Sequence, residues 1–198
     1  MKYALRTIVP TGMMLLSTGA LATDWNVASG DWSTAGNWNP AAVPVGGNTA
    51  HIALNTGDTR TATYSTAGGF TTSSRFIAGL GTGTGIMTLS GSAGTLTFGG
   101  NNFGSANYVG VDGGTGTLNV NAGTVFINNG GALRVGSNGG NSTGTVNVGP
   151  NATLRIGERF LIGAGGSENG TDNLGGTNRG TFNMTGGTVS SRIFTAFG

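Results

Sequence analysis

Cysteine is absent from this chain of 198 residues, proline occurs four times, and only 8% of the residues are charged. Without cysteine the chain has neither a disulfide framework nor a Cys-ligated zinc site. With so few prolines, and without glycine at every third position, it is not collagen-like. Its charge is too low, and its hydrophobic fraction of 36% too high, for a highly charged disordered protein.

Three residue types dominate instead, with 41 Gly, 30 Thr and 20 Asn. All three are poor helix formers, and the good helix formers Glu and Lys are nearly absent, which excludes a helical bundle. Thr favours strands, whereas Gly and Asn favour tight turns. The composition therefore predicts an all-β protein with many tight turns.

Residues 1–22 have the three parts of a secretory signal peptide. They begin with the positive residues Lys2 and Arg6, continue with an apolar stretch, and end in small residues before Thr23. The apolar stretch is much shorter than the ~20 residues that a membrane-spanning helix needs. We therefore expect an exported protein, at the cell surface or outside the cell, whose mature chain has no transmembrane helix.

Cleavage before Thr23 changes the charge balance. The whole chain has a formal net charge of +2, but the region after residue 22 holds seven Arg, no Lys and seven acidic residues, and is neutral. Its Arg residues are scattered, whereas nucleic-acid binding needs a basic patch or stripe. We therefore predict no nucleic-acid partner.

Much of the chain is a degenerate repeat. One phrase, such as Gly-Thr-Leu-Asn-Val at 116–120, is followed by a second, such as Gly-Thr-Val-Phe-Ile at 123–127. A third short phrase that ends in Gly, such as 108–110, precedes each pair. The first phrase begins at Gly85, Gly116, Gly144 and Gly180, at intervals of 31, 28 and 36 residues. Each unit thus holds three short strands.

Within a phrase, apolar and polar residues alternate, with Leu118 and Val120 on one face and Thr117 and Asn119 on the other. Short strands in a repeat of this length indicate a solenoid or a propeller. Propeller blades need four strands and longer units, so we predict a right-handed parallel β-solenoid (β-helix) with about three short strands per coil, ahead of a propeller or a β-sandwich. Apolar residues then stack inside, and Thr and Asn form rows on the outer faces.

We place the coils at 71–198 and a Trp-rich N-terminal cap, with the first strands, at 23–70. The cap carries all three tryptophans, Trp25, Trp32 and Trp38. Two interpretations remain open: a stacking surface for carbohydrate, or the core of a cap that closes the first coil. The second is favoured because the terminal repeats of solenoids are usually caps.

Several short motifs of the cap occur in a distinctive order: Gly30-Asp31-Trp32, Asn37-Trp38, Val43-Pro44 and Gly47-Asn48-Thr49-Ala50. Together with the Gly-Thr phrases that follow, this order resembles large bacterial surface proteins with autotransporter-associated β-strand repeats, over most of the mature chain. The resemblance implies an exported β-helical passenger associated with the outer membrane. It also implies a membrane β-barrel, so we expect that a C-terminal continuation is missing after Gly198.

Residues suited to catalysis or to metal binding are few. His51 is the sole histidine, so a catalytic triad or a His-ligated metal site would depend on it. Paired carboxylates for glycoside hydrolysis, or several oxygens for calcium, would have to come from the acids after Asp58. These acids are Asp112, Glu158, Glu168 and Asp172. No motif accompanies them, and we predict no catalytic residue, no metal site and no cofactor.

We therefore predict a non-enzymatic, adhesin-like or structural surface passenger whose partner is a host or environmental surface or a glycan. The alternative is a secreted β-helix that binds or degrades polysaccharide, as pectin-lyase-like enzymes do, and it requires some of the four acids to share one face. A third candidate, ice binding, needs a flat and regular Thr array. The unequal intervals of 31, 28 and 36 residues argue against that array.

Overall fold

The computed structural model describes residues 22–45, 47–55, 57–72, 75–99, 106–128, 131–163 and 177–196. Apart from one short 3-10 helix, η1 (Ala35–Asn37), the regular elements there are strands. They are β1 (Ala22–Trp25), β2 (Ser29–Asp31), β3 (Trp38–Asn39), β4 (Thr49–Leu54), β5 (Thr59–Tyr64), β6 (Phe70–Thr72), β7 (Phe76–Leu80), β8 (Thr84–Leu89), β9 (Thr95–Phe98), β10 (Asn107–Val111), β11 (Thr115–Ile127), β12 (Leu133–Ser137), β13 (Thr143–Ile162), β14 (Arg179–Met184) and β15 (Thr188–Ala196). The predicted signal peptide lies outside these residues, except that Ala22 begins β1.

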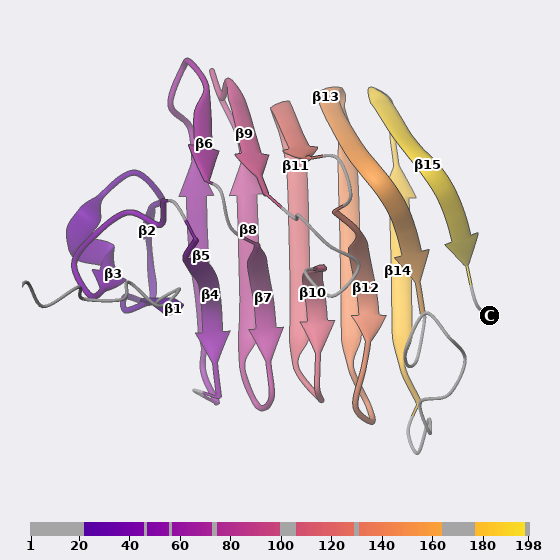
Figure 1. The fold of residues 1–198 in the computed structure, drawn as a ribbon, viewed down its shortest axis with the longest axis horizontal. Helices are drawn as coiled ribbons and strands as arrows, with labels where there is room; N and C mark the ends of the chain where they lie inside the picture. The colour runs from indigo at the N-terminus through magenta and orange to yellow at the C-terminus, as the bar shows by residue number, and fades with distance from the viewer. Residues whose placement is uncertain are drawn as a thin grey trace, which may run out of the picture.

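The chain winds into a solenoid with three faces, and successive coils lie side by side along its long axis (Figure 1). Face A consists of β1, β4, β7, β10, β12 and the last residues of β13 and β15. Face B consists of β2, β5, β8, β14 and the first residues of β11 and β13. Face C consists of β6, β9, the second half of β11, the middle of β13 and the start of β15.

The strands pair as the repeat predicts. Gly116 pairs with Gly85 on one side and with Gly144 on the other, and Gly144 pairs in turn with Gly180. The second phrases also pair in parallel, for example over residues 124–127 and 153–156. An all-β fold with a β-solenoid is therefore confirmed.

The coils begin earlier than residue 71. β4, β5 and β6 form a complete coil that pairs in parallel with β7, β8 and β9. β1 and β2 add one more layer to faces A and B, and β3 runs antiparallel to β1. The first strands expected within residues 23–70 are thus already strands of a coil. The β4–β6 coil lacks the Gly-Thr phrase but keeps its alternation: in β5 the inward Ala62 and Tyr64 are buried, whereas Thr61 and Thr63 are half-buried.

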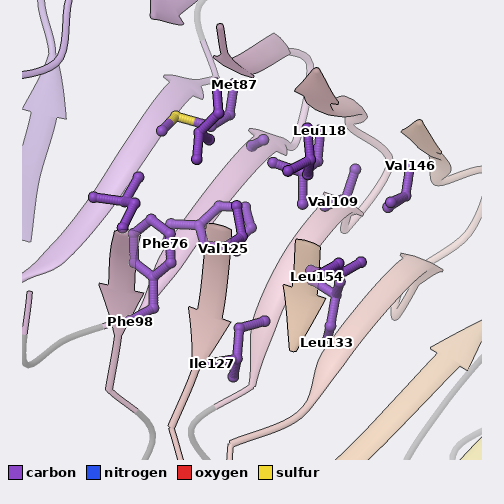
Figure 2. Close-up of a cluster of buried hydrophobic side chains, with 14 of the residues drawn as sticks. Phe76, Met87, Phe98, Val109, Leu118, Val125, Ile127, Leu133, Val146 and Leu154 are labelled. Carbon is purple, nitrogen blue, oxygen red and sulfur yellow. The ribbon is translucent and has the colours of Figure 1, made fainter. Parts of the chain in front are cut away.

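Alternate residues of all three faces point inward and form ladders along the solenoid. On face B, Met87, Leu118 and Val146 occupy one register position in three successive coils. Figure 2 shows these side chains in one buried cluster with Val109 of face A and Val125 of face C inside the coils. Each inward side chain therefore packs against the equivalent residues of the neighbouring coils. The strand register thus also determines which residues form the core.

Faces A and B come closest at the corner that joins them. A Cβ added at Gly116 would overlap backbone atoms of Gly110 and Val109 in its own coil and the carbonyl of Ala78 in the preceding one. Gly110 also has a φ of 75°, in the left-handed region that favours glycine. Glycine recurs at both positions because two backbones touch here with no side chain between them.

Tyr64 supplies a pH-dependent contribution to stability, because its side chain is buried in β5. Burial raises the pKa of its hydroxyl above the ordinary value of 10.0, and the Asp31 carboxylate raises that pKa further. At a pH near and above 10 the folded chain therefore still holds this proton, whereas the unfolded chain loses it. The free energy of unfolding thus falls as the pH rises above about 10. Urea unfolding at about pH 8 and about pH 11 should show a smaller loss for Tyr64→Phe than for the wild type, and an equal loss would contradict this role.

Candidate functional site

The outer side of face B carries a regular array of threonine and asparagine side chains. It spans five neighbouring strand segments, in β5, β8, β11, β13 and β14, whose alternate residues point inward. Pairing between these segments sets the remaining, outward residues in three rows. The rows are Thr59, Thr84, Thr115, Thr143 and Arg179; Thr61, Ile86, Thr117, Thr145 and Thr181; and Thr63, Thr88, Asn119, Asn147 and Asn183. We call these fifteen residues the face B array.

The spacing of the face B array follows from strand geometry. Neighbouring strands lie about 4.8 Å apart, and alternate residues of one strand are about 6.6 Å apart. The side chains therefore form a two-dimensional grid rather than a single stripe. Among them, Thr59, Thr115, Thr181 and Asn183 are exposed to solvent, and Thr117 and Thr145 are half-buried between their neighbours in the row. Such a grid offers hydroxyl, methyl and amide groups at repeated positions.

The third row is locked by hydrogen bonds that run from coil to coil. The Nδ2 of Asn119 donates to the Oγ1 of Thr88 at 3.2 Å. The Nδ2 of Asn147 donates to the Oδ1 of Asn119 at 2.7 Å, and the Nδ2 of Asn183 donates to the Oδ1 of Asn147 at 2.9 Å. This ladder fixes the orientation of each amide and ties four coils together. The outer rows of Thr and Asn expected from the sequence are thus present on this face.

We expect Asn147→Ala to lower the free energy of unfolding by about 1 kcal/mol, because two side-chain hydrogen bonds are lost and water replaces part of them at this half-buried site. The matched control is Asn151→Ala, which removes an exposed asparagine of the same strand and should change that free energy by less than about 0.5 kcal/mol. Chemical denaturation of both variants measures the difference. Equal effects would show that the ladder adds no stability.

The three tryptophans do not form a carbohydrate-stacking surface. Trp25, Trp32 and Trp38 are 1%, 0% and 1% exposed, so none of their rings has a free face for a sugar. The ring of Trp38 lies edge-on to those of Trp25 and Trp32, with centroids 4.8 and 4.6 Å away. Trp32 also reaches Phe98 of face C at 5.8 Å. The stacking hypothesis is therefore wrong, because all three rings are buried in the apolar core at the N-terminal end of the solenoid.

The single histidine belongs to a pair that joins β1 to β4. The Nδ1 of His51 lies 2.8 Å from the Oδ1 of Asp24, on strands that are neighbours in face A. A catalytic triad would also need a nucleophile on the other ring nitrogen, and in the described part of the chain no hydroxyl group is hydrogen-bonded to His51. The His51–Asp24 pair therefore links β1 of the cap to β4 of the β4–β6 coil.

The two described acids of the four, Asp112 and Glu158, lie at different corners of the solenoid. Asp112 lies at the corner between faces A and B, whereas Glu158 lies at the corner between faces C and A, where the Nη1 of Arg192 is 3.2 Å from its Oε2. Glu168 and Asp172 lie outside the described residues. Within the described ranges no group of three or more His, Cys, Asp or Glu is placed to hold a metal ion. Asp112 and Glu158 therefore cannot form a paired-carboxylate site.

Sequence reasoning found only part of the face B array. It placed Thr117 and Asn119 on an outer face and counted residues 85–89 of β8 among the first phrases, but it missed the contribution of β5, whose outward residues are three Thr. The alternate threonines at residues 59–63 were the signal that would have revealed it. Arg179, at one corner of the face B array, is the sole charged residue of the array. The array contains no aromatic side chain.

No family model, no curated protein and no solved structure matches this chain. The resemblance to autotransporter-associated β-strand repeats therefore remains a prediction from the motifs themselves. No helix in the described ranges is both long enough and apolar enough to cross a membrane.

Proposed function

We propose that this protein is an exported, adhesin-like β-solenoid that works without catalysis and binds a solid surface through the polar side chains of its outer faces. The observation that carries the proposal is the face B array, in which 13 of 15 outward positions are Thr or Asn. Pairing and core packing of a solenoid constrain the inward positions, and they leave outward positions free to vary. The ladder gives the third row a role in stability, so the proposal rests on the uniform threonines of the first two rows.

Binding by such a face depends on many weak contacts acting at once. Each hydroxyl or amide contributes little, but contacts held on one rigid body add, because after the first is made the others form within one molecule. Rigidity matters since ordering flexible side chains on binding opposes affinity. Thr is stiff at χ1, and the Asn row is held by its ladder. The array is therefore organised before it meets a surface.

The test compares three forms of the full chain on solid cellulose, chitin, hydroxylated silica and ice. Thr117→Tyr combined with Thr145→Tyr places two large rings in the middle of the face B array. Thr124→Tyr combined with Thr153→Tyr is the matched control, because these two threonines are half-buried outward neighbours on face C. We expect the wild type and the control to remain on at least one of the four solids and the array variant to be washed off. Equal retention of all three forms, or no retention of the wild type, would contradict the proposal.

Export is a separate prediction. We expect the protein recovered from outside the cytoplasm of a bacterial host to begin at Thr23, because the small residues before it fit a signal-peptide cleavage site. N-terminal sequencing and intact mass measure this directly. Removal before Thr23 would take only the first residue of β1 and leave the pairs of Thr23 with Ala50 and of Asp24 with His51. A protein that keeps Met1 and stays in the cytoplasm would contradict the prediction.

The alternative of a polysaccharide-degrading enzyme has no support from the described residues. It relied on acids gathered on one face, and Asp112 and Glu158 occupy different corners. Binding of a polysaccharide without cleavage remains within the proposal, and cellulose and chitin in the panel test it.

A further inference from the structure

The unequal repeat lengths do not disturb the face B array. The first phrase keeps six paired residues in each coil, as residues 84–89, 115–120, 143–148 and 179–184. The length differences fall outside these six-residue segments: 99–106 joins β9 to β10, 163–178 joins β13 to β14, and β13 has one extra residue opposite 120–122 of β11. The expectation that intervals of 31, 28 and 36 residues argue against a regular Thr array is therefore wrong. Figure 1 shows the strands of the stack running side by side along the solenoid.

The chemistry of the array matches a solid made of ordered water. Each threonine offers a hydroxyl, which donates and accepts hydrogen bonds, and a methyl group, which water surrounds in an ordered cage. The repeat of about 4.8 Å along each row is close to the shortest oxygen repeat on the surface of hexagonal ice. Water held between rows of methyl and hydroxyl groups would therefore sit near ice-lattice positions before contact.

Charge and shape distinguish ice from the other candidate surfaces. Within the array the one charged residue is Arg179, at the end of a row, so the grid matches an uncharged lattice. A crystalline polysaccharide offers the flat faces of sugar rings, which aromatic side chains recognise. The array holds none, and the three tryptophans are buried in the cap. Complementarity in charge and in spacing thus favours ice.

The other two faces lack this grid. On face A the register position of His51 is occupied in the next coils by Ile77, Tyr108, Arg134 and Leu161, a mixture of aliphatic, aromatic and cationic side chains. On face C one row is Thr95, Thr124, Thr153 and Thr188, but the row beside it contains Phe126 and Arg155, whose guanidinium lies 4.9 Å from the ring centroid. The threonine row of face C therefore has no second row of Thr and Asn beside it, as the rows of face B have.

We propose that the face B array binds ice. This inference rests on the proposed function, in which an outer face of the solenoid adheres to a solid, and it names that solid. Adsorption to ice pins the growing crystal surface between bound molecules, so the protein lowers the temperature of crystal growth below that of melting and slows the coarsening of small crystals. Neither effect arises from binding to a polysaccharide.

The experiment measures the gap between the melting and growth temperatures of a single ice crystal, and the retention of fluorescently labelled protein on a growing ice shell. The samples are the wild type, Thr117→Tyr with Thr145→Tyr, and the face C control Thr124→Tyr with Thr153→Tyr. Circular dichroism and thermal unfolding establish that each variant keeps the β-solenoid. Tyrosine is a good strand residue, and all four positions point outward, so we expect both double variants to fold.

We expect the wild type and the face C control to facet the crystal, to open the temperature gap and to enter the ice shell. The face B variant should show no gap above buffer and be excluded from the ice. If the wild type itself is excluded from ice but held on cellulose, chitin or silica through face B, the ice assignment is overturned and the adhesin-like function stands. If no solid retains it, both fall. If the face B variant enters ice as well as the wild type, the array is not the ice-binding site.

Discussion

Replacing Gly116 by alanine is expected to lower the free energy of unfolding by about 3 kcal/mol or more, at the upper end of what overpacking costs. The new Cβ would overlap backbone on several sides: the amide of Gly110, the carbonyl of Ala78 and the carbonyl carbon of Val109. Backbone cannot swing aside as the end of a long side chain can, so faces A and B must separate locally. Chemical denaturation of the purified variant measures the loss.

Gly36→Ala is the matched control, because no atom of the described residues lies within 4 Å of a Cβ added there. It should change the free energy of unfolding by less than about 0.5 kcal/mol. Gly91→Ala isolates a second effect, since the site is equally open but has a φ of 65°, and it should cost about 1 kcal/mol. A Gly116→Ala variant as stable as the Gly36→Ala control would show that the two faces do not touch at this corner.

The coil next to the cap shows why glycine is required at this corner only in the middle of the stack. There Arg60 pairs with Gly85, and so holds the position that glycine holds in the later coils. Its Nη1 donates to the carbonyl oxygen of Trp25, at the edge of the cap. A side chain is thus accommodated where the corner borders the cap, whereas Gly116 has a complete coil on each side.

Trp32→Ala is expected to lower the free energy of unfolding by about 4 kcal/mol, as truncation of a fully buried tryptophan does. The ring has no exposed surface and packs edge-on against Trp38 and Phe98. Solenoid coils are stabilised mainly by their neighbours, so the loss should be concentrated at this end. Hydrogen exchange should therefore accelerate in β4 and β5 more than in β13.

Two further variants separate packing from hydrogen bonding in the cap. The indole N–H of Trp32 has no hydrogen-bond partner among the described residues, so Trp32→Phe should cost less than half as much as Trp32→Ala. Val45→Ala removes an apolar side chain that is 51% exposed and should change stability by less than about 0.5 kcal/mol. An equal loss for Trp32→Ala and Val45→Ala would contradict the view of the cap as the apolar closure of the first coil.

The alternation of apolar and polar residues and the spacing of the glycines predict most of the fold. Leu118 and Val120 alternate with Thr117 and Asn119, and that period of two decides which residues point inward. The glycines that open each first phrase, such as Gly116 and Gly144, pair in the structure because they occupy the same corner. The parallel coil could therefore be derived residue by residue from residue 76 onward.

The remaining features depend on distances that a linear pattern does not contain. Trp25, Trp32 and Trp38 have the same surroundings in sequence whether they close a coil or face solvent. Only their packing against one another, and of Trp32 against Phe98, decides between the two. Likewise, the intervals of 31, 28 and 36 residues include loop residues as well as strand residues, so they do not show whether the strands themselves are regular. The regularity of the face B array became visible only when the strands were placed beside one another.

The register of face B across coils of unequal length is the central claim, and paired nitroxide labels test it most directly. The chain has no cysteine, so labels attach only at introduced sites. Thr117→Cys with Thr145→Cys places two labels on paired residues of neighbouring strands, about 4.8 Å apart at the backbone. Thr117→Cys with Thr153→Cys places them on faces B and C. We predict strong dipolar broadening of the electron paramagnetic resonance spectrum for the first pair and much weaker broadening for the second. Equal broadening, or broadening of the second pair alone, would contradict the stacked array and the function inferred from it.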